Sequence, residues 1–181
     1  MRPSTTPSLN VSGFALRPID LSDADDWYAY LSMPGVLAHT SWNLASADEL
    51  REAIARYNVD DPASPIRFAL HESGGGPVVG TVGFHSISPP HRTAELAYDL
   101  HPALWGRGLA SACARAAVAW GLFERSHARI QAVVLDTNAP SIRVLERTGF
   151  EREGMLRNYR TVRGEPRDFW MYSIIPSGGG S

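Results

Sequence analysis

The sequence contains no lysine, so all 17 of its basic Lys/Arg positions are arginine. This absence excludes chemistry that depends on a lysine side chain, such as the phosphate-binding lysine of a P-loop or the Schiff base of pyridoxal enzymes. Cysteine is nearly absent too. Because Cys113 is the single thiol, the chain cannot close an internal disulfide. An all-arginine complement is typical of a GC-rich genome, which favours a bacterial source.

Long apolar runs are missing as well. No segment reaches the roughly 18 apolar residues that span a bilayer, and the start of the chain lacks the apolar core of a signal peptide. We therefore expect a cytoplasmic protein that does not contact a membrane. The six histidines show neither a His-x-x-x-His spacing nor a Cys/His cluster, so we expect no metal site.

What the chain does contain is typical of one globular domain. Its 181 residues are 44% hydrophobic and 20% charged, and a chain of this size buries roughly 70% of the surface that it exposes when unfolded. We expect residues 1–12 to form a disordered N-terminus, residues 13–176 a single domain, and residues 177–181 a flexible Gly/Ser tail.

The charges are distributed unevenly along the chain. The net charge is −2, yet residues 1–106 carry 6 arginines against 12 acidic residues, whereas residues 107–181 carry 11 against 7. An anionic ligand would favour the second half, although random scatter of surface charge explains the counts equally well. At this net charge we expect no dense basic face, and hence no binding of nucleic acid.

Turn residues and apolar periodicity predict an α/β fold with elements in the order β-α-α-β-β-β-α-β-α-β-β. That order indicates a mixed sheet with helices on both faces. The first helix follows capping residues at 20–23 and ends near Met33, before Pro34-Gly35. The remaining helices are predicted at 47–59, 107–123 and 140–147, and the strands at 14–18, 66–71, 78–87, 93–101, 130–135, 150–159 and 166–175.

One loop combines glycines with a helix start. A strand ends at His101-Pro102, the loop contains Gly106 and Gly108, and the next helix has no acidic residue as far as 122. Glycine lets the backbone approach a ligand closely, and the unpaired N–H groups of a helix's first turn bind anions, so a pyrophosphate would fit. The spacing is not Gly-x-Gly-x-x-Gly, because Ser111 holds the third position. A tight turn that binds nothing is the alternative.

Three motifs in succession resemble a known family: AELAYDLHPALWGRGLA at 94–110, NAPS at 138–141, and Gly149-Phe150. Over about residues 14–175 the chain resembles the GNAT superfamily of acetyl-CoA-dependent N-acetyltransferases. Within it, the chain is most similar to the RimJ/RimL group of ribosomal-protein alanine and serine N-terminal acetyltransferases. The superfamily's Gln/Arg-x-x-Gly-x-Gly/Ala loop matches 105–110, with Trp105 in its first position. The resemblance implies the GNAT acyl-CoA N-acyltransferase fold and acetyl-CoA as the acyl donor.

The resemblance also implies which residues bind acetyl-CoA. The backbone N–H of Leu100 would hold the thioester carbonyl and stabilise the oxyanion, in a gap where its strand splays from the strand 130–135. Asn138 would contact the pantetheine arm or the departing sulfur, and capping the helix that begins at Pro140 is its alternative or additional role. The CoA pyrophosphate would be held by the main-chain amides of Trp105, Gly106, Arg107, Gly108, Leu109 and Ala110.

Two side chains are implied in catalysis. Many members use a tyrosine as the acid, but Leu145 stands at that position, so we assign Ser141 as the hydroxyl that donates to or orients the leaving sulfur. Glu95 is the candidate base, acting through a water, and Arg160 stands where some relatives carry a second glutamate. An α-amine with a pKa of about 7.7–8.0 needs only a weak base, unlike a lysine amine at about 10.4. The alternative for Ser141 is an ordinary serine at the start of a helix. The alternative for Glu95 is an ion pair with an arginine on a neighbouring strand.

The acceptor is expected beside the loop 35–44, which connects the two N-terminal helices. Trp42, Asn43 and His39 are the candidate contacts, although Trp42 could equally belong to the core. We expect direct attack on acetyl-CoA, because Cys113 lies on the apolar stripe of its helix and is packed rather than nucleophilic. The expected acceptor is the α-amine of a protein or peptide N-terminus. The alternatives are a small amine (an antibiotic, a polyamine or an amino acid) and a non-catalytic acyl-CoA sensor; a monomer and a homodimer both fit.

Overall fold

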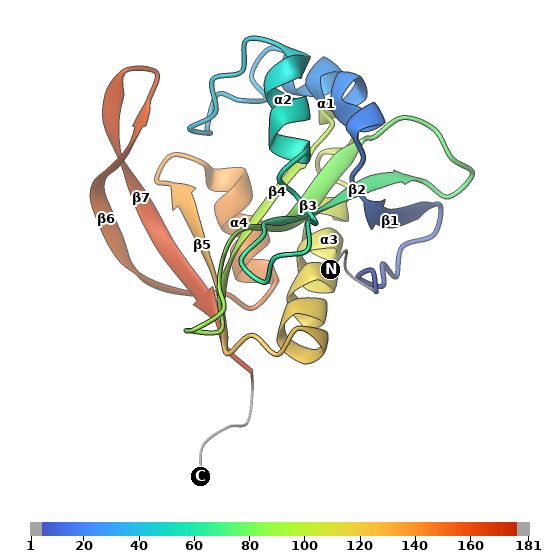
Figure 1. Cartoon of the computed structure of the whole chain (residues 1–181). Helices are drawn as coiled ribbons and strands as arrows, with labels where there is room; N and C mark the ends of the chain where they lie inside the picture. Colours follow the sequence, from blue (N-terminus) through green and yellow to red (C-terminus); the bar gives the residue numbers. More distant parts are fainter. Residues whose placement is uncertain (1–4, 177–181) are drawn as a thin grey trace.

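The computed structural model describes residues 5–176, in which seven strands form one mixed sheet (Figure 1). The strand order is β1-β2-β3-β4-β5-β7-β6, and neighbouring strands are antiparallel except for β4 and β5. The strands are β1 (Phe14–Pro18), β2 (Ile66–Glu72), β3 (Gly80–Ser88), β4 (Thr93–Leu100), β5 (Arg129–Leu135), β6 (Glu151–Val162) and β7 (Glu165–Ile174).

Helices cover both faces of the sheet, as the sequence predicts (Figure 1). Strand β2 shows how the two layers share the sheet. Phe68 and Leu70 are buried in the core that includes α3 and α4, whereas Ala69 between them is buried in the core of α1 and α2. Both faces of β2 therefore contribute apolar side chains to a core. The helices are α1 (Ala24–Leu31), α2 (Ala47–Ile54), α3 (Leu109–Ala119) and α4 (Ala139–Arg147).

The predicted element order is confirmed, but several helix ends differ. Helix α1 ends at Leu31 rather than near 33, and α3 ends at Ala119, where a π-helical turn (Trp120–Glu124) follows. Helix α2 ends at Ile54 rather than near 59, because the backbone tightens to i→i+3 hydrogen bonds after it and Asn58 then adopts a left-handed conformation (φ 57°). The Asn58 side chain exchanges two hydrogen bonds with the backbone of Arg67 on β2, at 3.1 and 3.2 Å. Helix α3 begins at Leu109 rather than at 107, because Gly108 has a φ of 78° that no right-handed helix contains.

The segment before β1 contacts the domain. Thr5 Oγ1 donates to Glu124 Oε2 (2.5 Å) and accepts from Trp120 Nε1 (2.8 Å), and Leu9 and Val11 pack against the larger core. These contacts fall within the predicted disordered N-terminus, of which residues 1–4 lie outside the described part of the chain, as does the predicted tail at 177–181. Among residues 5–176, no helix is long and apolar enough to cross a membrane.

The sheet opens between β4 and β5. The two strands pair over only three positions, from Thr93 with Arg129 to Glu95 with Gln131. Beyond these positions β4 stays paired with β3 as far as Leu100, and β5 stays paired with β7. The carboxyl ends of the two central strands therefore diverge and leave room between the two halves of the sheet.

Candidate functional site

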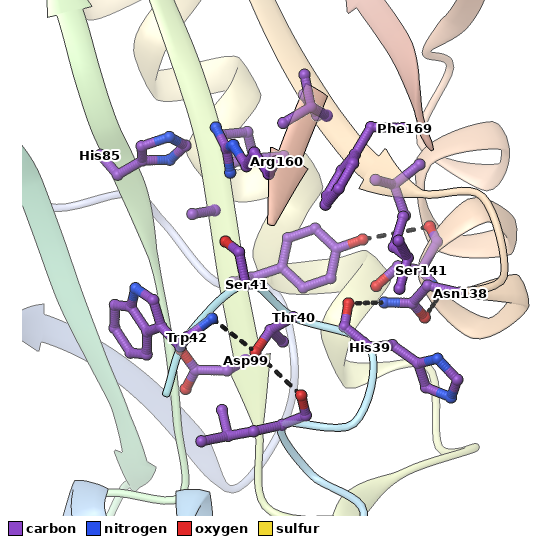
Figure 2. Close-up of a pocket in the computed structure, with 18 of the residues that line it drawn as sticks. His39, Thr40, Ser41, Trp42, His85, Asp99, Asn138, Ser141, Arg160 and Phe169 are labelled. Atoms are coloured by element: carbon purple, nitrogen blue, oxygen red, sulfur yellow. Dashed lines mark hydrogen bonds between the residues drawn. The ribbon is translucent and has the colours of Figure 1, made fainter. Parts of the chain in front are cut away.

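Two cavities meet at the carboxyl end of β4. The first, termed the loop cavity, has a volume of about 510 Å³ and is lined by the glycine loop before α3 and by the start of α4. The second, termed the sheet cavity, has a volume of about 280 Å³ and is lined by the loop 36–42 and by residues of β4, β5 and the β6–β7 hairpin (Figure 2). Tyr98, Asp99, Asn138 and Ser141 line both, so the cavities adjoin.

The loop before α3 has a backbone that glycine adopts readily and other residues do not. Gly106 (φ 74°) and Gly108 (φ 78°) are both left-handed, and a Cβ at either position would meet no atom within 4 Å. The glycines are therefore required by backbone conformation and not by lack of space. Gly108 is the N-cap of α3 and supplies no side-chain cap, and the first turn has no acidic residue. These features leave the first-turn N–H groups open to an anion.

The backbone of Leu100 faces the opening between β4 and β5. His101 N–H donates to Val79 O, just before β3, at 2.8 Å, and successive N–H groups of a strand point to opposite sides. The Leu100 N–H therefore points away from β3 and toward the opening. The Leu100 carbonyl points the same way and accepts from Trp105 Nε1 at 2.8 Å, so Trp105 folds back onto the end of β4.

The start of α4 contributes Asn138 and Ser141. Asn138 Oδ1 accepts the Ser141 N–H at 3.2 Å and caps the helix, which is the second role considered for it. Its Nδ2 donates to the His39 carbonyl at 3.5 Å and ties the loop 36–42 to α4 (Figure 2). Because Asn138 and Ser141 line both cavities, capping keeps Asn138 at the site.

Tyr98 is a cavity residue that sequence reasoning did not single out. Its phenol donates to the Ser141 carbonyl at 3.3 Å, and burial raises the pKa of the phenol to about 12. The hydroxyl therefore stays protonated at neutral pH. The signal that could have found it is spacing, since Tyr98 stands two residues before Leu100 and lies on the same face of the strand.

Glu95 is buried in a polar cluster. Its carboxylate accepts from His85 Nε2 (3.0 Å), Arg160 Nη2 (3.1 Å) and Gln131 Nε2 (3.2 Å). Burial alone would raise the pKa of Glu95, but the hydrogen bonds and charges of these partners outweigh it and lower the pKa. The ion pair with an arginine, considered as an alternative for Glu95, is present in the structure.

His85 reaches this cluster through a β-bulge. The register of β3 against β4 shifts between Phe84 and Ser86, so His85 is the extra residue. Its side chain lines the sheet cavity together with Arg160, whereas Glu95 itself is not among the lining residues (Figure 2). Sequence reasoning missed His85 and named Arg160 only as a departure from its relatives, because neither a bulge nor a contact across 65 positions has a local signature.

Asp99 is the second carboxylate near the cavities, and it joins four elements. Arg67 Nη2 (2.5 Å) on β2 and Thr81 Oγ1 (2.7 Å) on β3 donate to Oδ2. Trp27 Nε1 (3.1 Å) and the Tyr30 hydroxyl on α1 donate to Oδ1. Four donors occupy the carboxylate, whose side chain is 15% exposed. Asp99 therefore fastens α1 to the strands rather than offering an open acceptor.

Two of the three predicted acceptor contacts line the sheet cavity. They are His39 and Trp42 (Figure 2), whereas Asn43 lines neither cavity. Trp42 also packs against Trp27, with ring centroids 5.6 Å apart. Trp42 therefore packs against the smaller core and also lines the cavity.

The loop that carries these residues is fastened by the β6–β7 hairpin. Arg163, at the hairpin turn, donates to the carbonyls of Leu37, Ala38 (3.2 Å) and Thr40 (3.4 Å). Asn138 donates to the carbonyl of His39, which lies between Ala38 and Thr40. The loop is therefore bonded both to the β6–β7 hairpin and to the start of α4. These bonds hold the loop over the mouth of the sheet cavity.

One further feature agrees with the sequence. Cys113 is buried on α3, and burial raises the pKa of its thiol to about 12, as expected for a packed side chain. Within residues 5–176, no group of three or more His, Cys, Asp or Glu side chains is arranged to hold a metal ion.

Comparison with known proteins identifies the family. Residues 14–151 match the family described as acetyltransferase (GNAT) domain. The chain is 31% identical over 173 residues to the uncharacterized N-acetyltransferase YoaA of Bacillus subtilis, a match that covers 93% of this chain and 97% of YoaA. It is 30% identical over 172 residues to the uncharacterized N-acetyltransferase p20 of Bacillus licheniformis, covering 93% and 96%.

Solved structures share the fold. One is RimL, a ribosomal α-N-protein acetyltransferase in complex with coenzyme A, with a TM-score of 0.81, 18% identity, and coverage of 93% of this chain and 97% of RimL. Another is spermidine N-acetyltransferase from Vibrio cholerae in complex with CoA and spermine, with a TM-score of 0.79, 21% identity, and coverage of 90% and 95%. The two neighbours act on different amines, so the fold alone does not choose the acceptor.

The Asp99 cluster yields a stability prediction. Replacing Asp99 with asparagine leaves the Arg67 guanidinium, whose side chain is 4% exposed, without a counter-charge. We expect Asp99→Asn to lower the free energy of unfolding by about 3 kcal/mol, measured by urea denaturation. The matched control is Asp48→Asn, which breaks an ion pair with Arg51. Because the Asp48 side chain is 81% exposed, we expect this control to leave the free energy of unfolding unchanged. Equal effects of the two substitutions would contradict the structural role of Asp99.

Proposed function

The chain belongs to the GNAT family of N-acetyltransferases, and from this premise we propose that it transfers acetyl from acetyl-CoA directly to the α-amine of a protein or peptide N-terminus, as an enzyme of the RimJ/RimL kind. One observation carries the proposal: the loop cavity and the sheet cavity meet at the opening between β4 and β5. A thioester entering from the loop cavity and an amine entering from the sheet cavity would meet beside the Leu100 N–H. Direct attack needs no enzyme nucleophile, in keeping with the packed Cys113.

The loop cavity suits the phosphates and the long arm of CoA. Arg143 and Arg147 of α4 line it, and the backbone at 105–110 runs into the N-terminus of α3. Asp99 is the single carboxylate among its lining residues, and four donors already occupy it. CoA is present in RimL and in the spermidine acetyltransferase, which supports the same donor here.

Three groups would assist acyl transfer in this proposal. The Leu100 N–H would donate to the oxyanion of the tetrahedral intermediate. As the carbon–sulfur bond breaks, the Ser141 hydroxyl would donate to the leaving sulfur, with the Tyr98 phenol beside it. Because the pKa of Tyr98 is raised to about 12, the phenol would stay protonated, and by turning its one O–H from the Ser141 carbonyl to the sulfur it would stabilise a thiolate by a hydrogen bond.

The surroundings of Glu95 favour an acceptor with a low amine pKa. With its own pKa lowered, Glu95 is a weak base. An α-amine with a pKa of about 7.7–8.0 is partly neutral at pH 7, whereas a side-chain amine near 10.4 needs much more help. The amine proton would pass through a water to Glu95, whose carboxylate is hydrogen-bonded to His85.

A polyamine is the alternative acceptor that the spermidine acetyltransferase suggests. The lining of the sheet cavity favours it less. The arginine, histidine and acidic residues of that lining are Arg67, Arg160, His39, His85 and Asp99. A polycation needs unpaired carboxylates to bind, and the single carboxylate of this set is occupied. A peptide N-terminus brings one positive charge at most, so it fits this lining better.

The function is tested by thiol release from acetyl-CoA with purified protein. The panel contains peptides that start with Ser, Ala, Met or Thr, together with spermidine, free amino acids and an aminoglycoside. We expect turnover with at least one peptide class and at least about tenfold lower kcat/KM with spermidine. Turnover with small amines alone would move the function to metabolite or drug modification. Silence across the panel, with CoA binding intact, would identify a sensor.

Binding of the donor is tested at the glycine loop. We expect Gly108→Glu to weaken CoA binding by about 100-fold in isothermal titration calorimetry, because a carboxylate would face the phosphates. Gly164→Glu is the matched control, since Gly164 has a similar positive φ of 84° in the β6–β7 turn and lines neither cavity. Normal CoA binding by Gly108→Glu, or equal loss in both variants, would contradict the assignment of the loop.

The role of Glu95 is tested by pH. With an α-amine acceptor, we expect Glu95→Gln to reduce kcat/KM by about tenfold at pH 7 and by clearly less at pH 9, where the amine is neutral without help. Glu153→Gln is the control, because Glu153 is also paired with an arginine, Arg129 at 2.6 Å, and lines neither cavity. A loss of the same size at both pH values would assign Glu95 a structural role.

A further inference from the structure

Arg160 presents unused hydrogen-bond donors to the sheet cavity. Its side chain comes from β6, lines that cavity and is 33% exposed (Figure 2). Within residues 5–176 its guanidinium makes one hydrogen bond, from Nη2 to Glu95 Oε1 at 3.1 Å. An arginine side chain has five N–H donors. Most of the donor capacity of Arg160 is therefore left for a ligand.

Aromatic rings hold this guanidinium in place without using its donors. It lies 5.1 Å from the ring centroid of Tyr159 and 5.7 Å from that of Phe169, which also lines the sheet cavity. Contacts of this kind are made to the face of the aromatic ring by the positive charge and need no hydrogen-bond acceptor. The rings and the Glu95 bond thus fix the orientation of the group, which is the condition for recognising a planar anion.

The charged partner of Arg160 lies outside the lining of the sheet cavity. Arg67 and Asp99, which both line the cavity, neutralise each other at 2.5 Å. Glu95 balances the charge of Arg160, but it is buried, is shared with His85 and Gln131, and does not line the cavity. The Arg160 guanidinium therefore faces the cavity with unused N–H donors, which favour an anionic group on the acceptor over a second positive charge.

We propose that Arg160 forms a subsite for a carboxylate carried by the acceptor close to the reacting amine. This inference rests on the proposed function and names its substrate class. A carboxylate matches the planar edge of arginine and accepts two parallel hydrogen bonds from it. In a peptide, the carboxylate comes from an acidic side chain next to the N-terminal residue; in a free amino acid, it is the α-carboxylate.

The test compares peptides that differ only in their second residue. Peptides beginning Ala-Glu, Ala-Gln and Ala-Arg are acetylated at the same amine, and kcat/KM is measured for each at low and at physiological salt. We expect the wild type to favour Ala-Glu over Ala-Arg by at least about tenfold, and the ratio to shrink as salt rises. Alanine and alaninamide form a second pair, in which preference for alanine would point to a free α-carboxylate.

Variants assign the preference to Arg160. Arg160→Gln brings the Ala-Glu to Ala-Arg ratio close to 1, and Arg160→Glu inverts it. Either change also disturbs Glu95, but that disturbance alters the rate with every peptide in the same direction and leaves the ratio intact. Arg152→Gln is the matched control, because Arg152 also lies on β6, over the ring of Trp170 at 4.5 Å, and lines neither cavity. Its ratio stays at the wild-type value.

Each outcome bears on the subsite. Turnover with no preference among the three peptides, or a preference that survives Arg160→Gln, overturns it and leaves the proposed function standing. If no amine is acetylated, the proposed function fails. The subsite is then decided by calorimetry of the N-acetylated Ala-Glu and Ala-Arg peptides on CoA-loaded protein. Tighter binding of the acidic peptide that is lost in Arg160→Gln supports the subsite, and equal binding overturns it.

Discussion

The short parallel pairing of β4 with β5 is the constraint on which the rest of the site depends. Only three residue pairs join the two strands, while each strand continues in an antiparallel partnership on its outer side. In a fully paired sheet, the N–H of Leu100 would be a ladder donor and the space beside it would be closed. Here the same N–H faces an opening that two cavities share, so a gap in the sheet becomes a place where two substrates can meet.

A strand end that lacks one neighbour needs other restraints to hold its geometry. One restraint comes from the side of β3, the neighbour that β4 keeps, because the His101 N–H donates to the carbonyl of Val79 just before β3. Asp99 supplies another, because its four donors come from α1, β2 and β3. Removing water from such a cluster is costly unless every partner is present. The cluster thus keeps the Leu100 backbone in position while α1 and the following loop cover the sheet cavity.

Local sequence predicts the order of elements and the glycine loop because both depend on neighbours in the chain. Gly106 and Gly108 are recognisable from a strand end followed by a helix start. The contact of Glu95 with Arg160 spans 65 positions, and strand periodicity identifies the face of a side chain without identifying its partner. His85 is harder still to predict, because its orientation depends on one bulged residue in β3. The end of α2 was missed for the same reason, since Asn58 bonds across to β2.

The arginine at 160 contacts both the candidate base and the sheet cavity. Burial would raise the pKa of Glu95, but the hydrogen bond and charge of His85, the hydrogen bond of Gln131 and the charge of Arg160 together lower it. The same guanidinium lines the sheet cavity with most of its N–H donors unused. In the reaction proposed above, a weakened base and these donors would therefore select together for an amine that loses its proton easily and carries negative charge nearby.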